Sequence, residues 1–504
     1  MEKILINDRE ALLKQLQEQK AQNARHQLTI VKLTEQIESL QHKLDKFFNM
    51  MYGVKSEKKP KVKAEPQFTV SDVVQGTKEQ KQSVVISNNA NGRRSIPPDF
   101  PRVRVEHDVP EGQRGCRCCS NKMQRMGKVI TEQLEYKPGE FYVIEHVRLK
   151  YACQRCKQDI VTAELPRQPI DKGLPGPGLL TEVILNKYQD HLPLYRQEKR
   201  FLRSGIDLPR STLCDWVMQS AMLLEPIVKR MRTDSVLKGP RVFTDDTTVP
   251  VLAKDKTHTG RLWVYIGGGR ENPNAIVYEY TRSRSQIAPK NFLKGFKGYC
   301  QADAYSGYNV LYQSGEIIEV GCWAHARRKF SEIAKITKKS GLADTAIDII
   351  GQLYDIEQRG KFLTSLQKKY LRRKYSKPIL RKFHRWLKIE HQKALPKTPI
   401  GKAISYALNH WQALNNYLRD GILNIDNNTA ERAIKTVVIG RKNWLFAGSH
   451  EGAEKAAVLY SLIETCKLHG INPFLYFQNV LKRLPNTLMK NIDELLPYNW
   501  KLTA

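Results

Sequence analysis

The sequence predicts a multidomain protein of the α+β class. The chain has 504 residues, 41% of them hydrophobic, so it is too long for one core and apolar enough to bury several. An amino-terminal heptad pattern and two Cys-x-x-Cys pairs precede a helical segment. Near Arg241 the periodicity changes to that of short strands, and long helical patterns return after Trp323. Helical, metal-binding and mixed α/β segments therefore follow one another along the chain.

The charge balance favours a polyanionic partner. The chain carries 83 Lys and Arg against 51 Asp and Glu, a formal net charge of +32, and nucleic acid is the usual counterpart of such an excess. A membrane surface is the alternative. However, the sequence has no apolar run of about 18 residues, and its start, MEKILINDREALLKQL, lacks the apolar part of a signal peptide. We therefore expect a cytoplasmic protein without a membrane partner.

Residues 1–52 are predicted to form a coiled coil. Apolar residues that alternate in steps of three and four mark its a/d seam, namely Ile30, Leu33, Ile37, Leu40, Leu44 and Phe47. The alternative is one amphipathic helix packed on its own protein, but the narrow stripe between Lys, Gln and Glu residues favours a homo-oligomer. Residues 53–100 turn polar and lysine-rich, and they are predicted to be a flexible basic linker.

Residues 101–165 are predicted to be a zinc-ribbon-like module. The two Cys-x-x-Cys pairs consist of Cys116, Cys119, Cys153 and Cys156, and 33 residues separate the pairs. Two such pairs place four thiolates around Zn²⁺ and favour a reducing compartment over a disulfide scaffold. Cys118 is an alternative ligand beside Cys119. The Zn²⁺ is expected to be structural, because four protein ligands leave no open position for chemistry.

Residues 166–235 are predicted to be a helical, helix-turn-helix-like domain that binds DNA. The stretch GIDLPRSTLCDWV is typical of the turn and second helix, with Gly205 in the turn and Ser211 and Thr212 opening the helix. Similar helical pairs also occur in bundles that do not bind DNA, so a plain bundle is the alternative.

Residues 236–445 are predicted to be a mixed α/β domain with a basic helical insertion at about 323–425. The stretches RVFTD, RLWVYIGGG, AIVYEYT, GYCQAD and EIIEVGC are typical of strands, and SQIAPKNFLKGF of a helix. Residues 359–397 contain 14 Lys or Arg and a single acid, Glu390, a net of +13. A solvated charged face is the plain explanation, but interleaved aromatic residues favour nucleic-acid backbone as the counter-charge. Residues 446–504 are predicted to be a carboxy-terminal helical segment.

Three acidic residues of this region form a candidate metal site. Asp245 and Asp303 each end a predicted strand, and Glu431 begins a predicted helix. Two Asp and one Glu can hold two Mg²⁺ about 3.5–4 Å apart, the arrangement for in-line phosphoryl displacement. Each acid alone is more often a helix cap or an ion pair. Asp246 is an alternative to Asp245, because strand alternation does not tell which of them faces the site.

A series of short motifs runs along nearly the whole chain. The motifs are MYGVKSEK, GCRCCS, YACQRC, KYQDHLPLYRQEKRF, LPRSTLCDWV, FTDDTTVPVL, QADAYSGYN, GCWAHARRKF, DNNTAERAIK, GRKNWLFAGS and LPYNW. Their content and order resemble the transposases of the insertion sequence 66 family of bacterial mobile elements. The resemblance implies an RNase H-like catalytic domain with an Asp-Asp-Glu triad and a helical insertion before the Glu. The chain departs from the family pattern at Asp246 and Thr248, where the family has Glu and Pro.

Carried over motif by motif, the resemblance implies that Asp245, Asp303 and Glu431 are catalytic and hold two Mg²⁺ or Mn²⁺ ions. It implies a DNA transposase that binds the terminal inverted repeats of an insertion sequence, cleaves the ends and transfers the 3′-OH strands to target DNA. The expected neighbours of the triad or of the DNA are Asp246, His325, Arg327, Asn428, Arg432 and Lys435. For His325 and Arg327, helix packing is the alternative role.

The resemblance also implies partners and a place in the cell. The partners are double-stranded DNA at the element ends and the target, a second protomer, and accessory proteins of the same element. The place is the bacterial cytoplasm, at the nucleoid when DNA is bound. Two other classes fit part of the sequence: a non-catalytic zinc and helix-turn-helix regulator, and an RNase H-like nuclease that cuts DNA without joining it. The regulator leaves the three carboxylates without a role.

Overall fold

The computed structural model describes most of the chain after residue 165. The described residues are 173–253, 256–269, 272–336 and 341–502, together with 139, 141–152, 160–162, 164, 166–171 and isolated positions between 19 and 40. The chain divides into two compact units, one made of Met1–Ser56 with Pro166–Ala504 and the other of Glu57–Leu165.

The smaller unit contains one short antiparallel strand pair among its described residues. β1 (Lys150–Ala152) pairs with β2 (Ile160–Thr162), with Tyr151 opposite Val161. The predicted linker and the cysteines predicted to bind zinc lie outside the described residues, namely Cys116, Cys118, Cys119, Cys153 and Cys156.

The amino-terminal seam is described only in part. Leu33, Ile37 and Leu40 lie in helical conformation and are exposed. The pairing of two such helices into a coiled coil stays a prediction.

A group of helices precedes the sheet of the larger unit. They are α2 (Pro177–Tyr188), α3 (Leu194–Arg203), α4 (Arg210–Met231) and the π-helical turn η2 (Arg232–Val236). Gly205, with φ of +83°, allows the turn between α3 and α4, since a side chain disfavours that conformation. The buried face of α4 repeats every three or four residues, at Leu213, Val217, Ala221, Leu224 and Val228, as expected for a helix packed on one side.

Five strands form a mixed sheet at the centre of the larger unit. They are β3 (Arg241–Leu252), β4 (Thr257–Gly269), β5 (Asn272–Thr281), β6 (Gly298–Gln301) and β7 (Ile317–Val320). Their order is β5-β4-β3-β6-β7; β3, β4 and β5 are antiparallel neighbours, whereas β6 and β7 run parallel to β3. The predicted strands are therefore present, and the predicted α+β class is confirmed.

The first strand is longer than the sequence predicts. A strand that ends at Asp245 was expected, but β3 continues to Leu252. The reason is that β3 pairs with β4 residue by residue, from Val242 opposite Gly267 to Leu252 opposite Thr257. Val249 and Val251 are buried along this extension, which gives it the alternation of a half-buried strand.

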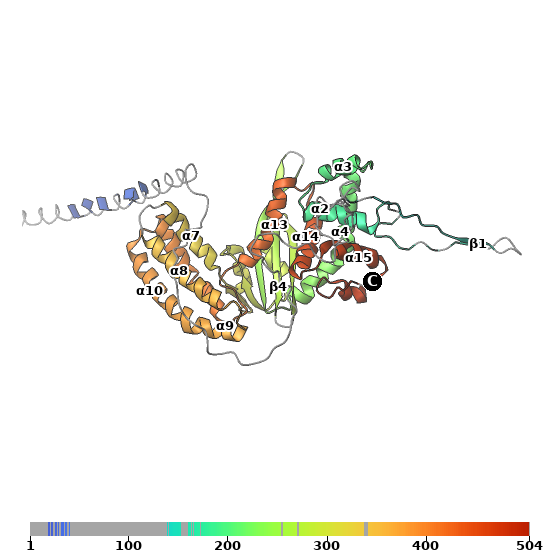
Figure 1. Ribbon diagram of the computed structural model, residues 1–504. Helices are drawn as coiled ribbons and strands as arrows, with labels where there is room; N and C mark the ends of the chain where they lie inside the picture. The colour runs from blue at the N-terminus through green and yellow to red at the C-terminus, as the bar shows by residue number, and fades with distance from the viewer. Residues whose placement is uncertain are drawn as a thin grey trace, which may run out of the picture. The chain divides into compact units, whose positions relative to one another are not determined.

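Helices from the end of the chain cover one edge and one face of the sheet. α13 (Asn428–Trp444) packs against β3 and β4, and α14 (His450–Leu468) packs along the edge strand β5 (Figure 1). Ser461 accepts a hydrogen bond from the Tyr278 amide (2.8 Å), and Thr465 bonds both the amide and the carbonyl of Ile276 (3.0 Å each). The open edge of β5 is thus satisfied by side chains rather than by another strand.

Short helices cover the opposite face of the sheet. They are α5 (Ile287–Phe292), η3 (Ser306–Tyr308) and α6 (Asn309–Tyr312). Phe292 stacks on Tyr265 of β4 with ring centroids 3.6 Å apart, and Tyr308 meets Trp263 edge to face at 6.0 Å. Large aromatic side chains therefore fill the space between this face and its helices.

Between β7 and α13 the chain forms a helical insertion with a hydrophobic core of its own. Its elements are α7 (Trp323–Ile336), α8 (Leu342–Arg359), α9 (Ser365–Leu371), η4 (Arg372–Ser376), α10 (Lys377–Lys393), α11 (Pro399–Asn409), α12 (Trp411–Asn415) and η5 (Asn416–Leu418). Trp323, Phe330 and Phe383 are fully buried in that core. The indole of Trp323 donates to the Leu414 carbonyl (2.8 Å) and so ties the two ends of the insertion together.

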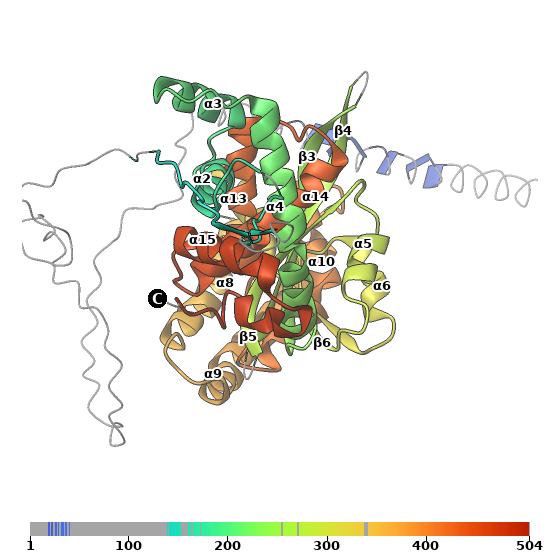
Figure 2. The same ribbon diagram turned by 90° about the vertical axis from the view of Figure 1, so that its right-hand side faces the viewer.

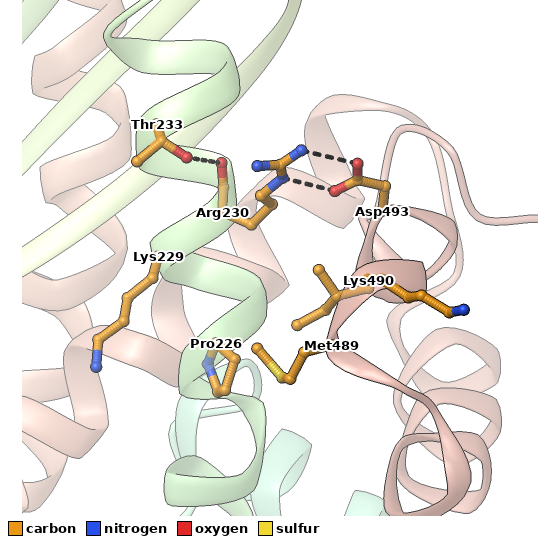
Figure 3. A pocket seen from close by; sticks show the side chains of 8 residues that line it. Pro226, Lys229, Arg230, Thr233, Met489, Lys490 and Asp493 are labelled. Carbon is orange, nitrogen blue, oxygen red and sulfur yellow. Dashed lines mark hydrogen bonds and ion pairs between the residues drawn. The ribbon is translucent and has the colours of Figure 1, made fainter.

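The last described elements are α15 (Pro473–Arg483), η6 (Leu484–Asn486) and η7 (Met489–Leu495); α15 packs against α2, and η7 packs against α4 (Figure 2). Arg230 of α4 binds both carboxylate oxygens of Asp493 (2.7 and 2.9 Å) beside a cavity of about 520 Å³, which Pro226 and Met489 also line (Figure 3). This pair joins the carboxy-terminal segment to the helices before the sheet. Among the described helices, none combines the length and apolar composition that a membrane span requires.

Candidate active site

The sheet register brings two of the predicted carboxylates to neighbouring positions. β3 and β6 run parallel, and their last paired residues are Phe243 and Gln301. Asp245 and Asp303 each follow that pair by two residues. Because β6 ends at Gln301 while β3 continues, Asp245 lies within its strand and Asp303 lies in the loop beyond the end of β6. Parallel strands progress at the same rise per residue, so the two carboxylates lie at the same level of the sheet.

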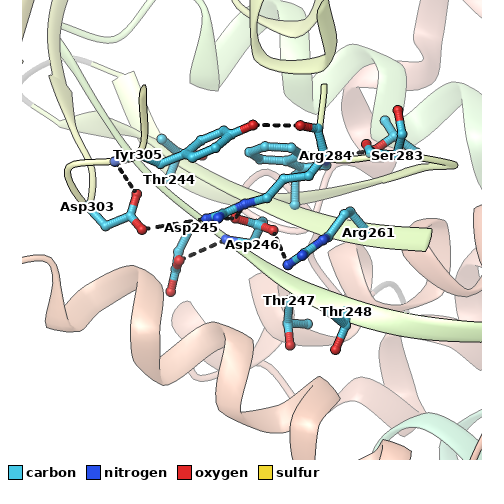
Figure 4. A network of polar contacts seen from close by, with 12 residues as sticks. Thr244, Asp245, Asp246, Thr247, Thr248, Arg261, Ser283, Arg284, Asp303 and Tyr305 are labelled. Carbon is cyan, nitrogen blue, oxygen red and sulfur yellow. Dashed lines mark hydrogen bonds and ion pairs between the residues drawn. The ribbon is translucent and has the colours of Figure 1, made fainter. Parts of the chain in front are cut away.

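The register also separates Asp245 from Asp246. Directly opposite residues of an antiparallel pair share a face, and Asp245 is opposite Val264 whereas Asp246 is opposite Trp263. Asp246 therefore lies on the aromatic face. There it accepts hydrogen bonds from Arg261 (3.0 Å) and Arg284 (2.8 and 3.0 Å), and its side chain is only 1% exposed. Figure 4 shows Asp246 between the two arginines and Asp245 pointing away from both.

Glu431 reaches the cluster from the first turn of α13. Asn427, the N-cap residue of α13, fixes this turn on the sheet. Its side-chain amide donates to the carbonyl of Thr244 (2.9 Å), the residue before Asp245. The backbone amide of Asn427 donates to Cys322 Sγ (3.2 Å) just before α7. The start of α13 is therefore attached both to β3 and to the beginning of the insertion.

The three carboxylates repel one another. Burial raises the pKa of Asp245, a hydrogen bond from the Asp246 amide lowers it, and the negative charges of Asp303, Asp246 and Glu431 raise it again, so that together they bring it to about 7. Burial also raises the pKa of Asp303, although the Tyr305 amide and the charge of Arg284 oppose the change. Among the described residues, no side-chain cation pairs with Asp245. The cluster therefore holds more negative charge than the protein itself balances.

Two arginines that sequence reasoning missed contact this cluster. Arg284 lies 3.6 Å from Asp303 while it binds Asp246, and its guanidinium stacks over the Tyr305 ring at 3.8 Å. Arg328 lies 3.5 Å from Glu431 Oε2. The stretch RSRSQ gives no periodic signal for Arg284, because the residue follows β5 in a loop. The sequence motif predicted its neighbour Arg327, and not Arg328, as the contact. The charge of Arg327 instead acts on the pKa of Tyr354.

The other expected neighbours lie at different distances from the carboxylates. His325 is adjacent, with Nδ1 3.6 Å from Glu431 Oε1, and burial lowers its pKa. Asn428 instead bonds Asp426 through both its backbone and its side-chain nitrogen. Arg432 and Lys435 are exposed on α13 and thus accessible from solvent.

Three family models match successive parts of the chain. Residues 172–455 match the model of the transposase IS66 family, which includes all five strands and all three carboxylates. Residues 113–157 match the zinc-finger binding domain of transposase IS66, and residues 461–498 match the IS66 C-terminal element.

Similar proteins are known from Sinorhizobium fredii, and all three bear names that state no function. The uncharacterized protein y4hP is 33% identical over 497 residues, which cover 92% of this chain and 89% of that protein. The uncharacterized protein y4jD is 33% identical over 420 residues, covering 81% of each chain. The uncharacterized protein y4qI is 34% identical over 420 residues, covering 80% of this chain and 76% of that protein.

These matches define the class of the protein as a DNA-processing enzyme with a zinc-binding module. The chain belongs to the IS66 family of transposases. The family resemblance stated from the sequence motifs is thus confirmed. Membership implies that the protein binds DNA and uses a divalent metal, and it leaves the roles of single residues to the geometry.

Proposed function

We propose that the chain is a DNA transposase of the Asp-Asp-Glu type. In this proposal it binds the terminal inverted repeats of its insertion sequence, cleaves the DNA ends and joins the 3′-OH strands to target DNA. The sheet with its helical insertion serves as an RNase H-like catalytic domain. The observation that carries the proposal is that the charges of Asp303 and Glu431, from a loop and a helix far apart in sequence, both raise the pKa of Asp245 on its strand.

The residues present fit a pair of divalent cations. Carboxylate oxygens are the ligands that Mg²⁺ and Mn²⁺ prefer. Glu431 Oε1 is buried without a hydrogen-bond partner, and the pKa of Asp245 is raised to about 7. A nearby positive charge would therefore stabilise both carboxylates in their ionised form. Asp245, Asp303 and Glu431 would hold the ions, which supply charge stabilisation at the phosphate and activation of the attacking oxygen.

The protein side chains around the triad have separate tasks. Arg261 and Arg284 neutralise Asp246, which therefore supports the strand rather than binding metal. Arg284 also contacts Asp303 and so holds the loop after β6 close to β3. Arg432 and Lys435 extend from α13 beside Glu431, and we assign them to the DNA backbone.

The chemistry consists of two displacements at phosphorus. In the first, a water oxygen attacks the phosphodiester at the element end; the bond to the 3′ oxygen breaks, leaving a 3′-OH on the element and a 5′-phosphate on the flank. In the second, this 3′-OH attacks a phosphodiester of the target, and one phosphodiester bond replaces another. No oxidant or nucleotide is consumed. No side chain forms a covalent bond to DNA, so no nucleophilic Ser or Tyr is required.

Recognition of the DNA ends is assigned to the parts before the sheet. We propose that the zinc-ribbon-like module, with Cys116, Cys119, Cys153 and Cys156 as ligands, and the helical segment 166–235 read the inverted repeats. Residues 1–52 pair two protomers, so that two ends are held together. The basic insertion lies along the DNA, because α10 and its surroundings carry the +13 segment.

The experiment that tests the proposal uses purified protein, labelled element-end duplex and Mg²⁺ or Mn²⁺, scored for nicks and joined products. Asp303→Asn should retain end binding, because the loss of a negative charge does not weaken attraction to phosphate. It should lower cleavage by about a thousandfold, since a lost metal ligand removes several kcal/mol of transition-state stabilisation. Glu279→Gln is the matched control, since Glu279 is a second partly buried carboxylate whose pKa is raised to about 7.

The products separate the remaining classes of protein. Nicks without joined strands would support a nuclease. Binding that is equal with and without divalent metal, with intact strands, would support a regulator. Undiminished cleavage by Asp303→Asn would contradict the assignment of the triad.

A further inference from the structure

A second set of metal-binding groups adjoins the carboxylate cluster. Cys322, His325 and Glu431 each place one ligand atom within 4.8 Å of the other two. They come from the starts of α7 and α13, which the hydrogen bond from the Asn427 amide to Cys322 Sγ joins. A thiol, an imidazole and a carboxylate form a donor set that suits Zn²⁺, whereas Mg²⁺ takes oxygen ligands.

The surroundings of Cys322 favour a thiolate once a cation is present. The backbone amides of Asn427 and His325 donate to its sulfur. Cys322 directly precedes α7, so the positive end of that helix dipole also faces the sulfur. The residue is only 2% exposed, and burial raises the pKa of its thiol to about 12.

One ring nitrogen of His325 and one carboxylate oxygen of Glu431 lie near each other without forming a hydrogen bond. Nδ1 and Oε1 are 3.6 Å apart, which is too long for a hydrogen bond, and both atoms are buried without a hydrogen-bond partner. Ligand atoms of a tetrahedral zinc site lie roughly 3.3–3.8 Å apart, given metal–ligand distances of about 2.0–2.3 Å. Arg328 contacts the other oxygen of Glu431, Oε2, and so leaves Oε1 available.

We propose that Cys322, His325 and Glu431 form a Zn²⁺ site that shares Glu431 with the catalytic carboxylates. On binding, the Cys322 proton passes to solvent and Zn²⁺ takes its place on the sulfur. Because one carboxylate then serves two sites, Zn²⁺ inhibits the Mg²⁺-dependent reaction. The inhibition rests on the proposed function, whereas the binding of the ion does not.

Cobalt absorption tests the site without any assay of activity. Full-length protein whose zinc-finger module is loaded with Zn²⁺ is titrated with Co²⁺, which gives a near-ultraviolet charge-transfer band when a thiolate binds it. The wild type should show the band, Cys322→Ser should lose it, and His325→Gln should require about tenfold more Co²⁺. Cys214→Ser is the control, because Cys214 is an exposed thiol elsewhere and its removal should leave the band intact. No band in the wild type, or an equal band in Cys322→Ser, would overturn the site.

Zinc inhibition tests whether Glu431 is shared. End cleavage at fixed Mg²⁺ is measured with rising Zn²⁺, and each variant is compared with its own rate without added Zn²⁺. Cys322→Ser and His325→Gln should need about tenfold more Zn²⁺ for half inhibition than wild type or Cys214→Ser. Equal inhibition of all four proteins would overturn the sharing of Glu431. Absence of cleavage from every protein would instead contradict the proposed function, and the cobalt result would stand.

Discussion

The carboxylate cluster and the core of the helical insertion differ in whether a buried charge has a partner of opposite charge. In the insertion, the guanidinium of Arg372 is completely buried and uses all its donors. It binds both oxygens of Glu357 (2.7 Å each) and the carbonyls of Tyr417, Asp420 and Leu423 (2.8–2.9 Å). On the central strand of the sheet, by contrast, Asp245 is buried within the influence of the charges of Asp303 and Glu431, and its pKa is raised to about 7.

The difference separates a structural charge from a functional one. Arg372 and Glu357 satisfy each other, so the insertion needs no ion to keep its shape. Asp245 lacks such a partner among the described residues, and its burial near the other negative charges destabilises the protein until a cation binds. Sites that depart from local electrostatic balance are where functional groups concentrate.

The largest expected effect on folding is the loss of the insertion's buried ion pair. Glu357→Ala leaves the Arg372 guanidinium buried without its counter-charge, so the protein should lose about 3–5 kcal/mol of stability. Chemical denaturation monitored by circular dichroism measures the loss. Glu316→Ala is the control, because it removes an exposed ion pair with Lys297 and should leave the unfolding midpoint nearly unchanged. An equal effect of both substitutions would mean that the buried pair contributes no more to stability than the exposed pair.

A smaller effect is expected from the repulsion at Asp245. Its pKa rises from 3.8 to about 7 on folding, so the folded state holds the proton more tightly, and stability is lost as the pH rises from about 4 through about 7. Without divalent metal, Asp245→Asn should therefore match wild type at pH 4 and exceed it at pH 8, by on the order of 2 kcal/mol. Thermal unfolding at the two pH values measures the difference.

Magnesium should distinguish this carboxylate from an isolated one. Glu279→Gln should also gain stability at high pH, because burial raises the pKa of Glu279 to about 7. Added Mg²⁺ should stabilise wild type and Glu279→Gln equally, and Asp245→Asn much less. Equal stabilisation of all three proteins would show that the carboxylate cluster does not bind the ion.

The smallest expected effect concerns the basic surface of the insertion. Arg381 and Lys388 are exposed on α10. If both contact phosphates, the double variant Arg381→Gln/Lys388→Gln should reduce the slope of log affinity against log salt by about 2. Lys482→Gln/Lys490→Gln removes the same charge from the carboxy-terminal segment and should change the slope less. Equal slopes for the two double variants would argue against DNA along α10.

The sequence predicted the strands from Arg241 onward, because their alternation and the turns between them are local signals. It identified Asp245, Asp303 and Glu431 as candidates, yet it left the choice between Asp245 and Asp246 open. That choice depends on pairing with β4, a partner that the local pattern of β3 does not specify. The extension of β3 to Leu252 was missed for the same reason.

The contacts around the triad were the least predictable part of the site. Arg284 contacts Asp303, and Arg328 contacts Glu431, although the two residues of each pair lie far apart in sequence. No spacing rule connects such arginines with the carboxylates. Cys322 and His325 are three positions apart, but their third neighbour, Glu431, follows more than a hundred residues later. Tertiary structure alone joins such residues, so sequence periodicity cannot reveal them.

The most direct measurement is a Mn²⁺ titration of the protein with element-end duplex, in which the EPR signal of free Mn²⁺ reports binding. We expect about two bound ions per protomer. We further expect weaker binding for Asp245→Asn, Asp303→Asn and Glu431→Gln, and wild-type binding for Glu279→Gln. Identical Mn²⁺ binding by the wild type and all three triad variants would contradict the claim that these carboxylates hold the catalytic ions.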